Sequence, residues 1–196
     1  WGFNYPSAKL WNAFETGDSR RGATMFSEAE YLSYKSTDPN FDGSDWWDYN
    51  GYFRLKYGSF ANETNTGAVA ELNYGTNWRL VRYADVLLMK AEAHAMQNQD
   101  AQAQTELNKV RARAGLTGST ATGAALVDAI RQERFVELAF EGHRYFDLIR
   151  WGSAVANAEL SGIEHGDKFD FAKHAVFPIP ASEIAASPLL TQNPGY

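Results

Sequence analysis

The chain has 196 residues, of which 44% are apolar and 21% charged, a composition typical of a globular domain. Its formal net charge of −6 makes nucleic acid and anionic lipid poor partners, because both require a basic surface. The absence of cysteine excludes a disulfide framework and a thiolate nucleophile. No apolar run approaches the roughly 20 residues of a membrane-spanning helix.

Residues 1–76 are predicted to be rich in loops, because glycines recur at short intervals among many aromatic residues. Two short helices are expected within them, at Ser7–Phe14 with Ser7 as the N-cap and at Ser27–Tyr34. We expect this region to shape a ligand site and to pack on the rest of the chain. Because the sequence begins at Trp1 in a loop-like context, we also expect that upstream sequence with an export or lipid signal is missing.

Residues 77–152 are predicted to form a helical core. Apolar residues there repeat at helical spacing and so share one face: Leu80, Ala84, Leu87, Leu88, Ala91 and Ala95. After a polar break the pattern returns at Ala103, Leu107, Val110 and Ala114, and Gly115 ends it. The two helices form an antiparallel hairpin of about the ~34-residue length of a tetratricopeptide unit, and a generic helical hairpin fits the spacing nearly as well.

The remaining helices are shorter. The run Thr117–Gly123 reads as a surface connection leading into a third helix at Ala124–Glu141, which Gly142 stops. A further short helical segment is expected at Asp147–Trp151, and residues 153–196 form an irregular tail. The predicted fold is mainly α, a single domain of tetratricopeptide-like helical hairpins with a long aromatic-rich loop region.

Three carboxylates, Glu133, Glu137 and Glu141, stand four residues apart on one face of the third helix. This spacing can present acids for glycosidase chemistry, or it can hold ion pairs. Arginines lie within a few residues, and paired buried charges usually fix geometry, so we favour a structural role. The predicted ion-pair network consists of Glu133, Arg134, Glu137, Glu141, Arg144, Asp147 and Arg150.

Cofactor and metal sites have little support. The four histidines are scattered, and no nucleophile elbow, phosphate loop or dinucleotide fingerprint is present, so we predict no cofactor. Asp38, Asn40, Asp42 and Gly43 match positions 1, 3, 5 and 6 of a calcium-binding loop. Position 12 is Tyr49 instead of the bidentate Glu, which favours an ordinary turn and no metal.

The same loop continues into an aromatic cluster. Flat aromatic faces suit sugar rings while neighbouring Asp and Asn side chains bind hydroxyls, so the cluster is a candidate glycan platform. The competing interpretation is that these rings only pack the loop onto the helices. The candidate ligand-binding residues are Trp46, Trp47, Tyr49 and Tyr52.

The order of motifs resembles the C-terminal half of the SusD/RagB family of surface glycan-binding lipoproteins. Segments similar to the family are Arg82–Ala93, Leu107–Leu116, Ile130–Gly152, Phe177–Pro180 and Gln192–Tyr196, and Phe14–Arg21 resembles the family's Asp-Arg loop. Many relatives have Tyr where this chain has Lys90. The family's lipid-bearing cysteine and most of its ligand-contacting residues belong to an N-terminal half that this chain does not include.

The resemblance implies a non-enzymatic nutrient-binding subunit that works with a SusC-type TonB-dependent transporter at the cell surface, anchored in the outer membrane by lipid. Its implied ligand is an oligosaccharide or polysaccharide such as starch, or in some relatives a peptide. Specificity depends on loop geometry, so the sequence predicts a class of ligand and no particular polymer. Two rivals are a tetratricopeptide-like protein scaffold and a glycoside hydrolase that uses Glu133 and Glu137.

Overall fold

The computed structural model describes residues 4–37, 51–58, 77, 79–163 and 166–196. Contacts divide the chain into two compact units, Trp1–Gly142 and His143–Tyr196. The predicted helical core, residues 77–152, therefore runs across the boundary between the units. None of the described helices is both long and apolar enough to cross a bilayer.

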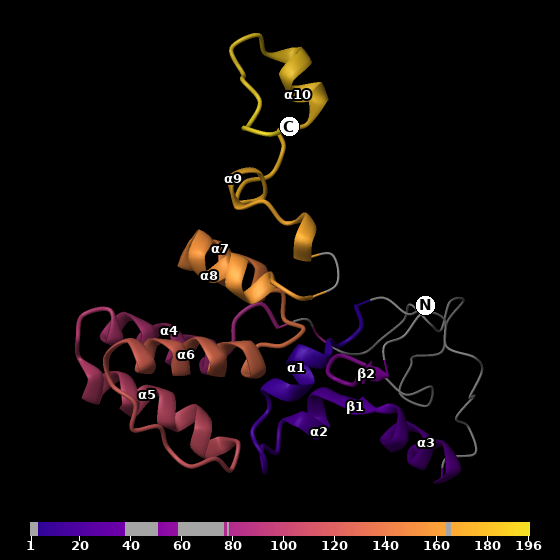
Figure 1. The fold of residues 1–196 in the computed structure, drawn as a ribbon, viewed down its shortest axis with the longest axis vertical. Coiled ribbons are helices and arrows are strands. Elements are labelled where there is room, and N and C mark those ends of the chain that lie inside the picture. Colours follow the sequence, from indigo (N-terminus) through magenta and orange to yellow (C-terminus); the bar gives the residue numbers. More distant parts are fainter. Residues whose placement is uncertain (1–3, 38–50, 59–76, 78, 164–165) are drawn as a thin grey trace. The chain divides into compact units, whose positions relative to one another are not determined.

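Three helices dominate the first unit. The helices α4 (Tyr83–Ala95), α5 (Asp100–Arg113) and α6 (Gly123–Glu137) lie side by side (Figure 1). Their shared core is made of the periodic apolar residues Ala84, Leu87, Leu88, Ala91, Ala95, Ala103, Leu107, Val110, Leu126 and Ile130. The predicted mainly α fold is thus confirmed. Hydrophobic burial by these faces is the main stabilising term of the unit.

Two helix boundaries in the three-helix core differ most from the prediction. Helix α4 begins only at Tyr83, because Arg82 is extended (φ −124°, ψ 152°), and Leu80 lies before the helix with 76% of its surface exposed. Helix α6 ends at Glu137 instead of Glu141. The chain then passes through Phe140, at φ +63°, and Gly142, at φ +83°, two left-handed positions that a continuing helix does not allow.

The N-terminal elements are short. Helix α1 (Ala8–Ala13) is capped by Ser7, whose hydroxyl accepts a hydrogen bond from the backbone N–H of Leu10 at 3.2 Å. It is followed by α2 (Arg21–Thr24), β1 (Met25–Ser27), α3 (Glu28–Thr37) and β2 (Tyr52–Arg54).

The strands β1 and β2 pair antiparallel, with Phe26 opposite Phe53. In the turn that leads into α3, Glu30 accepts a hydrogen bond from the N–H of Ser27 at 2.9 Å, and the Ser27 hydroxyl accepts from the N–H of Glu30. This reciprocal capping box explains why α3 starts after Ser27, within one residue of the prediction.

A second apolar cluster joins these N-terminal elements to the end of α6. Its buried members are Leu10, Met25 and Ala139, and the half-buried rings of Trp11, Phe14, Tyr52, Phe135 and Phe140 pack against them. The strand ribbon is thereby attached to the helical scaffold by side chains from α1, β1, β2 and the turn after α6.

The second unit consists of α7 (Arg144–Trp151), α8 (Ser153–Leu160), the 3-10 turn η3 (Gly166–Lys168), α9 (Phe171–His174) and α10 (Ala181–Ala186). Gly152, at φ +94°, separates α7 from α8. Residues 153–196 were expected to be irregular, yet they hold four short elements. The three alanines in Ser153–Leu160 supply helix propensity that the weak apolar periodicity did not indicate.

Candidate functional site

Three carboxylates form a row that we call the carboxylate ladder, defined as Glu133 and Glu137 of α6 and Glu141 of the turn that follows it. All three are buried, with only 2%, 3% and 6% of their surfaces exposed. Burying three like charges one helical turn apart is strongly unfavourable unless cations neutralise them. The ladder therefore depends on the groups that the rest of the unit brings to it.

Arg20 pairs with two of the three carboxylates of the ladder. Its guanidinium contacts Glu133 at 2.5 Å and Glu137 at 2.9 Å, and it also contacts Asp18 at 2.6 Å. The Arg20 side chain is only 10% exposed. Asp18, just before α2, thus orients an arginine that reaches 117 residues along the chain to Glu137.

Four further cations complete the ladder. Arg111 of α5 contacts Glu133 at 3.1 Å, and its guanidinium also holds Glu15 at 2.6 Å. Arg113, just along the same helix, contacts Glu137 at 2.6 Å.

At the far end of the ladder, Arg82 binds both Glu137, at 2.9 Å, and Glu141, at 2.7 Å. Lys56, just after β2, contacts Glu141 at 2.5 Å and donates a hydrogen bond to the carbonyl oxygen of Glu137 at 2.8 Å. Each carboxylate of the ladder is therefore paired with at least two cations, and these cations come from segments far apart in the sequence.

The arginines that the sequence placed in this network are paired elsewhere. Arg134 contacts Asp85 of α4 at 2.8 Å in a pair whose side chains are only 4% and 7% exposed. Arg144 contacts Glu159 at 2.6 Å, and Arg150 contacts Asp147 at 2.9 Å. The predicted members thus fall into separate clusters, with Arg144, Asp147 and Arg150 in the second unit.

Some residues of the ladder's surroundings were not predicted from the sequence, and the sequence gives them unequal support. Asp18 and Arg20 lie in the segment that resembles the family's Asp-Arg loop, but nothing there indicated their partners. Arg82 lies at the start of another such segment. Lys56 has no signal, because it follows a loop-rich stretch and only the fold brings it to Glu141.

The pKa values of the ladder carboxylates depend on two opposing effects, since burial raises them and pairing with cations lowers them. Burial raises the pKa of Glu137, but hydrogen bonds from Arg20 and Arg82 outweigh it, so the net pKa lies below the ordinary value of 4.5. Burial likewise opposes ionisation of Glu141, and Arg82 and Lys56 lower its pKa below 4.5. At Glu133 burial prevails over Arg20 and Arg111, and the pKa is raised.

These directions predict acid sensitivity. The charged forms of Glu137 and Glu141 stabilise the folded chain above about pH 4.5, and this contribution is lost as the pH falls through their lowered pKa values. Glu133 acts in the opposite sense, since its raised pKa favours folding at low pH and that contribution is lost as the pH rises through it.

We predict that the losses at Glu137 and Glu141 outweigh the gain at Glu133, so that the free energy of unfolding falls as the pH drops below about 4.5. Urea unfolding followed by circular dichroism at several pH values measures it. A free energy of unfolding that stays constant from pH 7 to pH 3 would contradict the ladder's pairing.

Of the four aromatic candidates, only Tyr52 lies among the described residues. Trp46, Trp47 and Tyr49, like the possible calcium ligands at 38–43, lie outside the described residues. Within the described part of the chain, no group of three or more His, Asp and Glu side chains gathers as a metal site.

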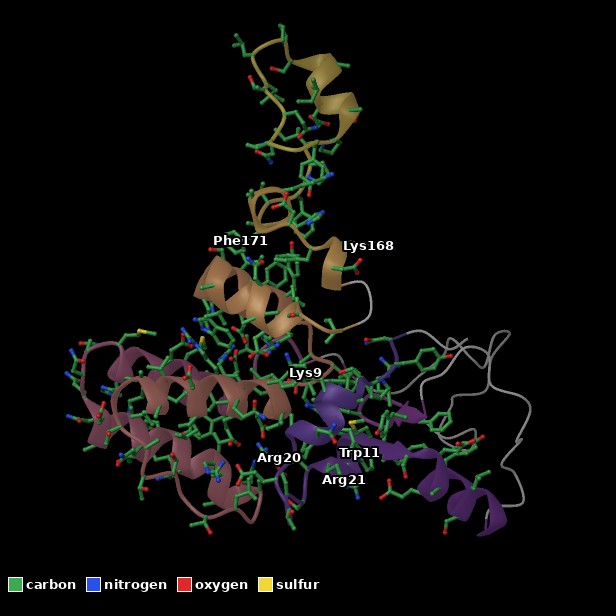
Figure 2. All side chains as sticks on the ribbon, viewed as in Figure 1. Lys9, Trp11, Arg20, Arg21, Lys168 and Phe171 are labelled. Carbon is green, nitrogen blue, oxygen red and sulfur yellow. The ribbon has the colours of Figure 1, made fainter. Side chains whose placement is uncertain are left out.

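Tyr52 is half-buried on β2, and its ring stacks on that of Trp11 at 4.9 Å. Arg21 lies over the Trp11 ring at 4.5 Å and pairs with Glu30 at 2.8 Å. Figure 2 labels Trp11, Arg20 and Arg21 on these N-terminal elements. The packing interpretation thus describes Tyr52 well, because its ring joins the second apolar cluster.

Residues 1–196 match the model of the SusD family over their whole length. The chain belongs to the SusD family. It is 30% identical over 215 residues to SusD-like protein P2 of Formosa agariphila, covering 100% of this chain and 41% of that protein. It is 32% identical over 127 residues to the starch-binding protein SusD of Bacteroides thetaiotaomicron, covering 62% of this chain and 22% of that protein.

The fold also matches solved structures of the SusD family. Surface glycan-binding protein A from Bacteroides uniformis superposes with a TM-score of 0.76 at 30% identity, covering 98% of this chain and 41% of that one. The chain thus spans about two fifths of the length of SusD-like protein P2 and of surface glycan-binding protein A.

Proposed function

We propose that this chain is part of a non-enzymatic glycan-binding subunit that captures oligosaccharide or polysaccharide for a SusC-type TonB-dependent transporter. In this proposal, residues 1–196 are one C-terminal domain of a lipid-anchored protein at the surface of the outer membrane. The observation that carries it is the match of the whole chain to the SusD family, whose similar members include proteins named as starch-binding and surface glycan-binding.

The ladder supports binding over catalysis. A glycosidase needs one carboxyl group that gives a proton to the leaving oxygen and a second that faces the sugar ring. The side chains of Glu133 and Glu137 are each 2% exposed and held by arginines. Such groups are committed to ion pairs, and neither is placed to touch a substrate.

We expect a variant with Trp46→Ala and Trp47→Ala to lose affinity for the glycan that the unaltered chain binds. Two stacking contacts of about 0.5–1.5 kcal/mol each sum to about 1–3 kcal/mol, which corresponds to roughly fivefold to 150-fold weaker binding. Isothermal titration calorimetry with a panel of neutral oligosaccharides measures this. Phe177→Ala removes a ring that is 66% exposed in the other unit and serves as the control, with unchanged affinity. Unchanged affinity in the double tryptophan variant would retire the platform.

The transporter partnership has its own test. Co-expression of the full-length protein with a SusC-type transporter from the same organism, followed by detergent extraction and affinity purification, should recover the two proteins together. Recovery of the chain alone, while glycan binding persists, would remove the transporter from the proposal and leave the ligand class intact.

One observation favours the rival protein scaffold. Helix α4 and its C-cap expose apolar side chains, namely Tyr83 at 73%, Val86 at 42%, Met89 at 46% and the C-cap Met96 at 56%, and exposed apolar surfaces mark protein contacts. A pull-down that recovers a soluble partner, together with no retention on any glycan, would favour the scaffold. The hydrolase would instead be supported by release of reducing sugar that Glu133→Gln or Glu137→Gln abolishes.

A further inference from the structure

A hollow of about 650 Å³ lies in the second unit, beside the turn that follows α8. Its volume falls within the range of about 300–1,000 Å³ that is common for small-ligand sites. Figure 2 labels Lys168 and Phe171, the residues around Phe169 in this region. The hollow is lined by Asn157, Leu160, Ser161, Gly162, Ile163, Gly166, Asp167 and Phe169.

Two of the described residues beside the hollow, Gly162 and Gly166, hold positions that require glycine. The N–H of Ser161 closes α8 on the carbonyl oxygen of Asn157 at 3.0 Å, and the N–H of Gly166 donates to that of Ile163 at 3.0 Å. Gly162 follows the helix end at φ +76°, a left-handed conformation. A Cβ atom at Gly166 would overlap the carbonyl oxygen of Leu160, so only glycine lets the backbone approach this closely.

The lining combines an apolar part with free polar groups. Leu160, Ile163 and Phe169 are half-buried, and the Phe169 ring is supported from outside by stacking on His174 at 5.7 Å. The remaining side chains that line the hollow carry hydrogen-bonding groups, namely those of Asn157, Ser161 and Asp167.

These three polar side chains are exposed and make no hydrogen bond or ion pair with another residue in the described part of the chain. One amide, one hydroxyl and one carboxylate therefore remain available to a ligand.

The chemistry of the lining narrows the ligand class. No Lys or Arg is among the described lining residues, so an anion such as phosphate lacks a counter-charge. Asp167 is the one carboxylate among the described lining residues, and one carboxylate supplies too few oxygen ligands for a calcium or magnesium ion. A purely apolar ligand would bury the three polar groups unpaired, which is unfavourable.

We propose that this hollow is a carbohydrate subsite that takes one or two neutral sugar units. The C–H face of a sugar packs on Phe169, while Asn157, Ser161 and Asp167 bind its hydroxyls. The ligand class rests on the proposed function, whereas the place of the site rests on the hollow and its unpaired polar groups. It lies in a different unit from Tyr52.

Titration of the whole 15N-labelled chain with neutral disaccharides (maltose, cellobiose, xylobiose and mannobiose) tests the subsite. We expect amide shifts at Gly162 and Gly166, and binding about fivefold weaker in Asn157→Ala and in Phe169→Ala. Asn157→Trp places an indole at the hollow and should abolish the shifts. Ser161→Ala should also weaken binding, and Ser182→Ala, which changes an exposed serine on α10, is its matched control and should bind normally.

The outcomes separate this inference from the proposed function. Glycan binding that persists unchanged in Asn157→Trp and Phe169→Ala would overturn the subsite and leave the proposed function standing. Absence of binding to every oligosaccharide by the unaltered chain would overturn the subsite, and the same absence in the full-length protein would overturn the proposed function as well. Circular dichroism of each variant shows that a loss of binding is local, since Asn157 is exposed and Phe169 half-buried.

Discussion

Replacing Arg20 by Met is expected to lower the free energy of unfolding by about 3–5 kcal/mol, the typical cost of removing one partner from a buried ion pair. Asp18 loses the side chain that holds it at 2.6 Å, while Glu133 and Glu137 each lose one of their cations. The methionine keeps much of the apolar stem, so the loss reports mainly on charge. Urea unfolding followed by far-ultraviolet circular dichroism measures it.

The neighbouring arginine is a matched control. Arg21 pairs with Glu30 at the surface, where the two side chains are 32% and 38% exposed, and it also lies over the Trp11 ring. Its replacement by Met should therefore cost only about 1 kcal/mol. Equal losses in the two variants would show that burial of the ladder contributes nothing beyond a surface pair.

Helices were predictable from this sequence because their signals are local. Burial of Leu87, Leu88 and Ala91 follows from a period of 3.6 residues. Ser7 caps α1 through a hydrogen bond to a residue only three positions away in the sequence. The first turn of α4 was placed too early, since Leu80 fits the period. Arg82 is extended and reaches Glu137 and Glu141. This tertiary contact cannot be read from the helical period.

The cations of the ladder were not predictable from spacing. Arg134 adjoins Glu133 in sequence, but residues one apart on a helix point in different directions, so it contacts Asp85 of α4 instead. Lys56 and Arg20 reach the ladder only because the strand ribbon and α1 pack on α6 through the second apolar cluster. Which cation meets which carboxylate is therefore a property of the tertiary fold.

For the aromatic candidate site, the sequence predicted the types of residue but not their arrangement. An aromatic loop beside Asp and Asn indicates a ligand class, while the fold decides which rings remain available. Tyr52 illustrates this, because its ring is shared between the candidate platform and the packing against Trp11. The free polar groups near Phe169 had no sequence signal, since Asn157, Ser161 and Asp167 belong to no motif and meet only where the turn after α8 closes.

Replacing Glu137 by Gln should lower the free energy of unfolding by about 3 kcal/mol, because the variant keeps the shape of the side chain but leaves Arg20, Arg82 and Arg113 without its charge. Thermal and urea unfolding at pH 7 measure this loss. Glycan affinity of the folded variant, measured below its melting temperature, should equal that of the unaltered chain.

Glu133→Gln, one helical turn away, is the matched control. Burial already raises the pKa of Glu133, which means that the fold tolerates a neutral group there better than at Glu137, whose pKa is lowered. We therefore expect a smaller loss, about 1 kcal/mol. If Glu137→Gln were fully stable yet lost glycan binding or a hydrolytic activity, Glu137 would act on a ligand, and the ladder would have to open to solvent during function.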